Sequence, residues 1–355
     1  MSEGNSDILK DIHISKIIWP VLIGVIIVFY MIIKQLDIDQ IRKIDWNTHV
    51  YFWIGIAILI YVIRHLALSL RLRLMSNNTF SFKKSIELIF IWEFSSAVSP
   101  TSFGGTAVAL FFLAQEKLKT SSTIALVLYS VVLDAMFFLI SIPLLFFTVG
   151  PIILRPDLHE FSLADRNVVL IIIVYTITFL YTTFFFIGLF VHPENVRKFL
   201  NWLSGLKILK KFSEKLRQTG NNFILASRQM SEQGFWFHFR AIFYTIIAWG
   251  IRFSLINVLI IAFSNMDYMD LFNQLVIYGR SQNLYVLSAL LPSPGSSGFS
   301  ELLFNGFFKD YVPLGISVLV IILWRLISFY SYLLAGVIVV PNWINKILKN
   351  RHKEN

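Results

Sequence analysis

The sequence predicts an all-α, polytopic membrane protein with about six full transmembrane helices and two re-entrant, broken-helix hairpins in an inverted repeat. Of its 355 residues, 56% are hydrophobic and only 15% are charged, whereas soluble domains carry about 25% charged residues. The apolar residues gather in runs about 20 residues long, which is enough to cross a hydrocarbon core of about 30 Å as a helix. Two further apolar segments are interrupted by Pro, Gly and Ser, and they resemble each other.

Six uninterrupted apolar runs predict the full spans. They lie at residues 17–33, 50–70, 121–148, 167–191, 241–263 and 312–340. Lys10 and Lys16 precede the first run, as they would in a cleavable signal, but no small-residue cleavage site follows it. We therefore expect the first run to be a retained membrane helix.

Charges in the connecting segments predict the orientation in a cell membrane. The segments rich in Lys and Arg are 64–85, the loop 192–240 and the tail 341–355, and the segments with acidic residues are 149–166 and 264–270. The positive-inside rule places the basic segments in the cytoplasm and the acidic ones outside. Both termini, including residues 1–16, are then cytoplasmic. This rule also accounts for the formal net charge of +10, so we expect no nucleic-acid partner.

The orientation requires each interrupted segment to enter and leave the membrane on one side. Segment 84–113 would enter from the cytoplasm and segment 270–308 from outside. The alternative, a single crossing by each, would put Lys117 and Lys119 outside. The order span, interrupted segment, span then occurs twice with opposed topology, in 50–148 and 241–340, within one membrane domain covering 1–355. Opposed repeats are typical of transporters, whose substrate sites lie near the bilayer midplane.

The two interruptions contain similar turns. Their candidate lipid-binding residues are Pro100, Gly104 and Gly105 in the first segment and Pro292, Pro294, Gly295 and Gly298 in the second. Irregular backbone at membrane depth is tolerated where it lines a cavity, because its polar groups otherwise lack partners. A helix that begins after such a turn favours an anionic group at its N-terminus. The alternative is that Pro and Gly simply end ordinary helices at the membrane edge.

Several charged residues fall within apolar segments, where a charge costs about 2.5–3.5 kcal/mol even on a lenient scale. Asp134 and Arg325 occupy nearly corresponding positions in the two repeats. We expect them to approach each other or to face one polar cavity; the alternative is a purely structural ion pair. The candidate lipid-binding side chains are Asp134, Arg252, Arg280, Glu301 and Arg325, and the candidate coupling carboxylates are Glu93, Asp134 and Glu301.

Other chemistry has little support in the sequence. The chain has no cysteine, and its histidines show no metal-binding spacing. We expect no cofactor and no enzymatic activity. The loop 192–240 is basic and weakly amphipathic, which fits a helix on an anionic membrane surface or a solvated linker.

The residues described above resemble the transmembrane domain of the lysylphosphatidylglycerol synthase/flippase family, from about residue 17 to 340. The most specific features are Pro-x-Pro-Gly-x-x-Gly-x-x-Glu, which ends at Glu301, and Arg-Leu-x-Ser-Phe, which begins at Arg325. The resemblance implies ATP-independent movement of an aminoacylated or other polar-headed lipid between leaflets. Because the chain ends near Asn355, the family's soluble aminoacyl-transferase domain is expected to be absent.

The resemblance leaves the lipid open. Ser296 and Ser297 stand where Gly is common in the family, and an anionic or an aminoacylated phospholipid remains a candidate. Two other functions stay open: a membrane enzyme or enzyme subunit acting on a lipid head group, and a scaffold that recruits partners through 192–240. A homo-oligomer is also compatible with the sequence.

Overall fold

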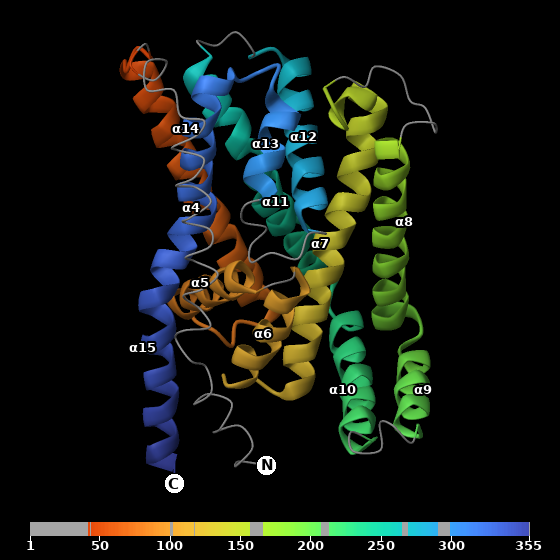
Figure 1. Cartoon of the computed structure of the whole chain (residues 1–355). Helices are drawn as coiled ribbons and strands as arrows, with labels where there is room; N and C mark the ends of the chain where they lie inside the picture. Colours follow the sequence, from red (N-terminus) through yellow and green to blue (C-terminus); the bar gives the residue numbers. More distant parts are fainter. Residues whose placement is uncertain are drawn as a thin grey trace.

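The structure, a computed structural model, is helical throughout its regular elements (Figure 1). It describes residues 42, 44–99, 102–116, 118–156, 166–206, 213–264, 269–289 and 299–354. Within these ranges, the helices long and apolar enough to cross a membrane are Thr48–Met75, Thr120–Val149, Phe235–Phe263 and Gly315–Ile347. Tyr175–Val191 and Pro193–Ser204 pass the same test only as a pair, bent by 108°. The predicted all-α, multi-pass architecture is confirmed, while the predicted span 17–33 lies outside the described residues.

The helices fall into two units of the same order. The first unit comprises α4 (Thr48–Met75), α5 (Phe82–Val98), α6 (Ser102–Ala114) and α7 (Thr120–Val149), which ends in the short helix η1 (Pro151–Ile153). The second comprises α11 (Phe235–Phe263), α12 (Leu271–Ala289), α13 (Phe299–Phe308) and α14 (Leu314–Arg325), which continues through the π-helical turn η5 (Leu326–Tyr330) into α15 (Ser331–Glu354). Between them lie α8 (Arg166–Phe186), the π-helical η2 (Ile187–Val191), α9 (Pro193–Ser204) and α10 (Ser213–Ser231).

The first full helix, α4, is longer than its apolar run predicts. It begins where the side chain of Asn47 accepts a hydrogen bond from the backbone N–H of Val50, at 3.2 Å. It continues beyond residue 70 to Met75, because Leu and Arg both favour helix and the segment holds no Gly or Pro. Asn77 and Asn78 then adopt positive φ angles and end it, as Asn does at helix C-termini.

Each interrupted segment forms two helices separated by a break. The first break follows Val98, and α6 begins at Ser102; the second follows Ala289, and α13 begins at Phe299. Gly104 and Gly105 therefore lie in the first turn of α6. The other predicted turn residues lie outside the described ranges: Pro100, Pro292, Pro294, Gly295 and Gly298. The side from which each segment enters the membrane stays a prediction.

The two units pack with exchanged partners. α4 runs along α11, α5 packs against α15 of the other unit, and α12 packs against α7. The pair α5–α6 lies toward the lower end of the molecule in Figure 1, and the pair α12–α13 lies toward the upper end. This reciprocal packing is compatible with an inverted repeat, which stays a prediction.

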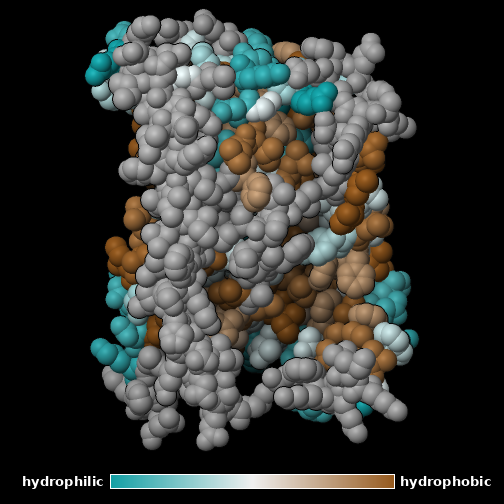
Figure 2. All heavy atoms as spheres, viewed as in Figure 1, coloured by the Kyte–Doolittle hydropathy of each residue, from teal (hydrophilic) through white to brown (hydrophobic). Residues whose placement is uncertain are grey.

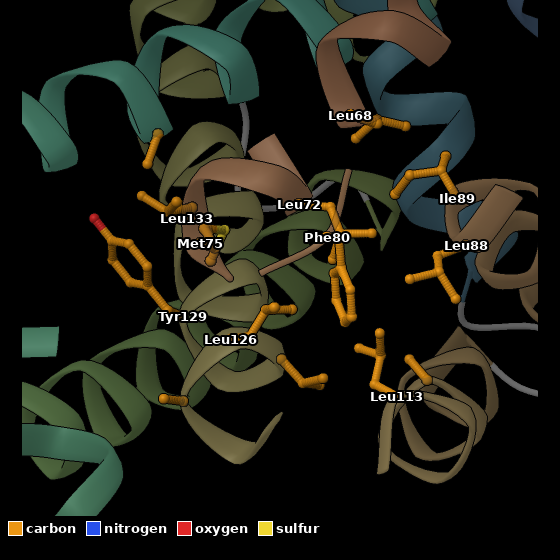
Figure 3. Close-up of a cluster of buried hydrophobic side chains, with 14 of the residues drawn as sticks. Leu68, Leu72, Met75, Phe80, Leu88, Ile89, Leu113, Leu126, Tyr129 and Leu133 are labelled. Atoms are coloured by element: carbon orange, nitrogen blue, oxygen red, sulfur yellow. The ribbon is translucent and has the colours of Figure 1, made fainter. Parts of the chain in front are cut away.

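The surface and the core both suit a bilayer. In Figure 2, hydrophilic residues gather at the two ends, and hydrophobic residues occupy the band between them. Large side chains in that band face outward, among them Ile140, Leu144 and Phe147. Inside, one cluster of buried apolar residues joins α4, α5, α6 and α7; Figure 3 labels Leu68, Leu88, Leu113 and Leu126 among its members.

Close helix packing requires glycine at two contacts with α5. A Cβ atom at Gly336 of α15 would overlap the ring of Phe94, and one at Gly105 of α6 would lie 2.8 Å from the Cα of Ser96. We expect Gly336→Ala to lower the free energy of unfolding by about 1–3 kcal/mol, the usual cost of overpacking. Gly306→Ala is the matched control, because Gly306 is helical and has open space around it. Equal stability of both variants in equilibrium unfolding in mixed micelles would contradict this expectation.

Candidate functional site

A cavity of about 250 Å³ lies between the two units. Its walls come from α4, α5, α6 and α7 of the first unit and from α11, α12, α13 and the helix that carries η5 in the second. The charged side chains that line it are Arg64, Arg71, Glu93, Asp134, Arg252 and Arg325. Six charged side chains at membrane depth require oppositely charged partners or a polar cavity, because lipid tails solvate neither positive nor negative charge.

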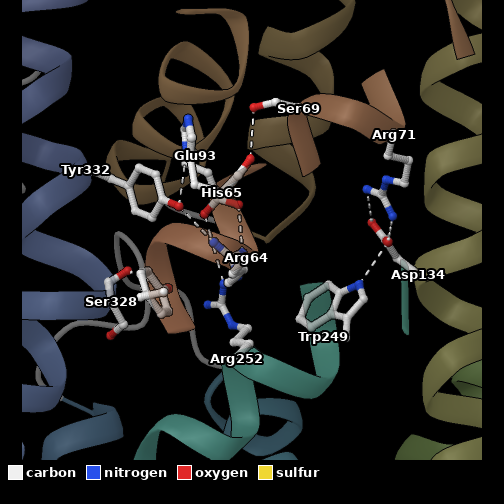
Figure 4. Close-up of polar contacts among 11 residues, drawn as sticks. Arg64, His65, Ser69, Arg71, Glu93, Asp134, Trp249, Arg252, Ser328 and Tyr332 are labelled. Atoms are coloured by element: carbon white, nitrogen blue, oxygen red, sulfur yellow. Dashed lines mark hydrogen bonds and ion pairs between the residues drawn. The ribbon is translucent and has the colours of Figure 1, made fainter. Parts of the chain in front are cut away.

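The first charged group joins α4, α5 and α15 (Figure 4). Arg64 forms a salt bridge of 2.8 Å with Glu93 and donates a hydrogen bond of 3.0 Å to the Tyr332 hydroxyl. The same hydroxyl lies 3.2 Å from Nδ1 of His65. The Arg64 guanidinium also lies over the rings of Tyr61 and Tyr332. Arg64 is only 3% exposed, so this group fixes the packing of three helices as well as lining the cavity.

The second group joins α4, α7 and α11. Arg71 forms a salt bridge with Asp134 and donates a hydrogen bond of 3.0 Å to the Thr245 hydroxyl. The indole N–H of Trp249 donates to the same carboxylate at 2.8 Å. Figure 4 shows the Asp134 carboxylate between the Arg71 guanidinium and the Trp249 indole.

The third group lies where the last long helix changes its hydrogen-bond pattern. Arg325 ends α14, directly before the π-helical turn η5, and π-helical turns are frequent at functional sites. Its Nε lies 2.7 Å from Oε1 of Glu301, which is fully buried on α13. The guanidinium lies over the ring of Phe329, 4.0 Å from its centroid. Within η5, the Ser328 carbonyl accepts a hydrogen bond of 3.0 Å from the Tyr61 hydroxyl of α4.

Arg252 differs from these three arginines. Its Nη1 lies 4.0 Å from Oε2 of Glu93, beyond hydrogen-bond distance. Its guanidinium lies 4.8 Å from the ring centroid of Tyr285 and 5.4 Å from that of Trp249.

The structure brings together some of the predicted residues and separates others. Asp134 and Arg325 do not pair with each other; each has its own partner, Arg71 and Glu301, and both face the one cavity. Glu93 and Arg252 also line the cavity. Glu301 does not line the cavity, although its partner Arg325 does.

Arg280 does not line the cavity. It is fully buried at the upper end of the molecule, where its Nη1 lies 2.7 Å from both carboxylate oxygens of Asp310. It also donates to the backbone carbonyls of Phe307, at 3.1 Å, and Ile152, at 3.0 Å. The idea that Arg280 shares a lipid site with Arg252 and Arg325 is therefore corrected: Arg280 ties α12 to α13 and to the end of α7.

The sequence interpretation missed two arginines of the site. Arg64 and Arg71 were assigned to the basic cytoplasmic segment 64–85, but the structure buries both within α4. Their spacing of seven residues was a usable signal, since residues seven apart lie on one face of a helix. Trp249, Tyr285 and Tyr332 carried no such signal, because aromatic residues are common in every apolar run of this chain.

The described residues offer no candidate metal centre: no three His, Asp or Glu side chains among them are grouped to hold an ion. What the arrangement offers is a polar space with arginines, carboxylates and serine hydroxyls, enclosed by an apolar exterior. Such a space suits a charged or polar group that must cross or reside in the membrane.

The chain is similar to a known protein family along most of its length. The family model described as the lysylphosphatidylglycerol synthase TM region matches residues 17–336. A UPF0104 membrane protein of Archaeoglobus fulgidus is 25% identical over 343 residues, which cover 92% of this chain and 96% of that protein. No solved structure matches the chain. With the family model matching most of its length, the chain belongs to the lysylphosphatidylglycerol synthase TM region family.

Proposed function

We propose that this protein is a transporter, not an enzyme, which moves a polar-headed lipid between the leaflets of the cell membrane without ATP. The observation that carries the proposal is the arginine-lined cavity, which both units enclose within an apolar exterior. Charged residues at membrane depth are expensive and mark substrate pathways in many transporters.

The size and chemistry of the cavity suit a head group. Its volume of about 250 Å³ is below the range of about 300–1,000 Å³ that holds a drug-sized molecule. The cavity would therefore hold a head group while the acyl chains stay in the bilayer. Arginine forks bind phosphate well, and the carboxylates Glu93 and Asp134 would accept an amine. An anionic or aminoacylated phospholipid fits these groups.

The reciprocal packing suggests how the head group would reach both leaflets. The pairs α5–α6 and α12–α13 lie toward opposite ends of the molecule, and each holds the long helix of the other unit. Loosening one pair at a time would open the cavity to one leaflet at a time, as rocking of repeats does in other transporters. The basic helices α9 and α10 and the C-terminal end of α15 share the lower end, so we place that end in the cytoplasm.

A leaflet-exchange assay tests the proposal. Purified protein in proteoliposomes, without nucleotide, should increase the exchange of fluorescently labelled phospholipids at least about tenfold over protein-free vesicles. Asp134→Asn should abolish most of this exchange rate, because Arg71 beside the cavity then loses its negatively charged partner. Leaving a charge inside the protein without its partner costs several kcal/mol. Glu194→Gln is the matched control, since Glu194 forms only an exposed pair with Arg197 on α9.

The opposite result is equally definite. Chemical conversion of the labelled lipid without leaflet exchange would contradict the proposal and favour the alternative, an enzyme that acts on a lipid head group. Equal loss of exchange in Asp134→Asn and Glu194→Gln would show that the cavity charge is not the cause.

A further inference from the structure

We infer that Arg252 binds the phosphate of the head group, and that the cavity selects a phosphodiester with a net charge of −1. The inference rests on the proposed function, because it names the substrate class of the same cavity. It narrows the candidates to anionic phospholipids and disfavours aminoacylated ones.

The first step is the pairing of the cavity arginines. Arg64 is bonded to Glu93, Arg71 to Asp134 and Arg325 to Glu301. Among the residues that the structure describes, Arg252 has no carboxylate within hydrogen-bond distance; its nearest is Glu93, at 4.0 Å, which already accepts from Arg64. Within the described part of the chain, Arg252 is therefore a cavity cation whose donors are available to a ligand.

The second step is the position of its guanidinium. The rings of Tyr285 and Trp249 lie near the guanidinium, and cation–π attraction stabilises its positive charge. Figure 4 shows Arg252 extending from α11 toward the Arg64–Glu93 group, with Trp249 to one side. A guanidinium can donate to two oxygens of one phosphate at once, and the aromatic neighbours of Arg252 leave its hydrogen-bond donors without a competing carboxylate at hydrogen-bond distance among the described residues.

The third step is a hydroxyl without a partner. Ser288 lines the same cavity, is 3% exposed, and its Oγ has no hydrogen-bond partner among the described residues. It lies three residues after Tyr285 on α12, so the two side chains share one face of the helix. A buried hydroxyl without a partner is unfavourable, and a phosphate oxygen in the cavity would supply the acceptor that Ser288 lacks.

The fourth step is the charge balance. Four arginines and two carboxylates line the cavity, and a third carboxylate, Glu301, pairs with Arg325. The group therefore carries a net charge of +1, which is costly inside a membrane unless a ligand offsets it. A phosphodiester monoanion makes the occupied cavity neutral. With a phosphomonoester dianion, or with a head group of net positive charge, the occupied cavity would keep a net charge.

Direct binding to the full-length protein in neutral detergent tests the inference. The probes are short-chain phosphatidylglycerol, phosphatidylcholine, lysylphosphatidylglycerol, diacylglycerol and inorganic phosphate, with native mass spectrometry as the readout. Phosphatidylglycerol should bind most tightly, and diacylglycerol should bind least. Arg252→Gln should weaken phosphatidylglycerol binding at least about tenfold, the size expected from losing a charge-assisted hydrogen bond. Arg252→Lys should keep only part of the affinity for phosphatidylglycerol, because an ammonium cannot form the two parallel hydrogen bonds that a guanidinium forms with a phosphate.

The controls separate a local effect from a general one. Arg240→Gln removes the same charge from an exposed position on the same helix, α11, and should leave binding unchanged. Ser288→Ala should weaken binding by a smaller factor than Arg252→Gln, with an unchanged unfolding transition. Unchanged phosphatidylglycerol affinity in Arg252→Gln would overturn the inference, and so would equal binding of phosphatidylglycerol and diacylglycerol. Inorganic phosphate binding as tightly as phosphatidylglycerol would show a free-phosphate site instead of a lipid site.

The inference and the proposed function fail in different ways. If phosphatidylglycerol binding depends on Arg252 but proteoliposomes show no exchange of any lipid, the transport proposal fails and the phosphate site stands. If exchange proceeds but Arg252→Gln binds phosphatidylglycerol as the unmodified protein does, the phosphate assignment fails and transport stands.

Discussion

Replacing Glu301 by alanine is expected to lower the free energy of unfolding by about 3–5 kcal/mol, the usual effect of removing one partner from a buried ion pair. Glu301 is fully buried, and the Arg325 side chain is only 6% exposed. The variant would leave a guanidinium inside the protein without its nearest carboxylate. Equilibrium unfolding of the purified protein in mixed micelles measures the change.

Two comparisons make this prediction specific. Glu194→Ala breaks an exposed pair on α9, and we expect a loss below about 1 kcal/mol. The double variant Glu301→Leu with Arg325→Met should recover most of the stability, because an apolar pair of similar volume avoids the desolvation of two charges. The double variant should still be impaired in lipid exchange if Arg325 contributes to the cavity. A Glu301→Ala protein as stable as the unmodified one would show that the pair does not hold α13 to α14.

The long helices were predictable because membrane spans obey a local rule. Apolar length alone decides whether a segment can cross a bilayer, and the predicted run 121–148 falls within α7, Thr120–Val149. The rule is weaker at helix ends. α4 continues past its apolar run to Met75, and Arg71 in this extension pairs with Asp134 of α7, which offsets the cost of its charge.

The pairing of the charges was not predictable, because it depends on how distant helices pack. The sequence predicts that Asp134 and Arg325 either approach each other or face one polar cavity, and the structure shows the second arrangement. Their actual partners, Arg71 and Glu301, come from neighbouring helices of their own units. Each unit thus neutralises its own deep charge. Only the three-dimensional arrangement reveals that Arg64 and Arg252 approach the same Glu93.

The charged contacts at the two ends of the molecule differ in how deeply they are buried. At the upper end, the fully buried Arg280 holds α12 to Asp310 and to the carbonyls of Phe307 and Ile152. We expect Arg280→Ala to lower the free energy of unfolding by about 3–5 kcal/mol, because it leaves buried carbonyls without donors.

The lower end is closed by partly exposed groups. Lys84 lies 2.7 Å from Glu116 and 3.5 Å from Glu87, and Lys346 of α15 lies 3.3 Å from Glu87. The Lys346 side chain is 65% exposed, so Lys346→Ala should cost less than about 1 kcal/mol. Because exposed ion pairs are also screened by salt, the contact between α5 and α15 should loosen as ionic strength rises.

Hydrogen exchange of the protein in lipid nanodiscs should reveal this difference without any mutation. Leu88 and Leu113 are buried in the core, so the exposed ion pairs and not the apolar contacts set the expected difference: if these ion pairs limit local opening, amides at the start of α5 and the end of α6 should exchange faster than those of α12 and α13. High salt should widen the difference, and Lys346→Ala should mimic high salt. Faster exchange in α12 and α13 would mean that the buried Arg280 contacts do not control opening. If the lower end is the weaker one, the cavity is reached most easily from the side of α5, α6 and α15, which is also the side that we propose to be cytoplasmic.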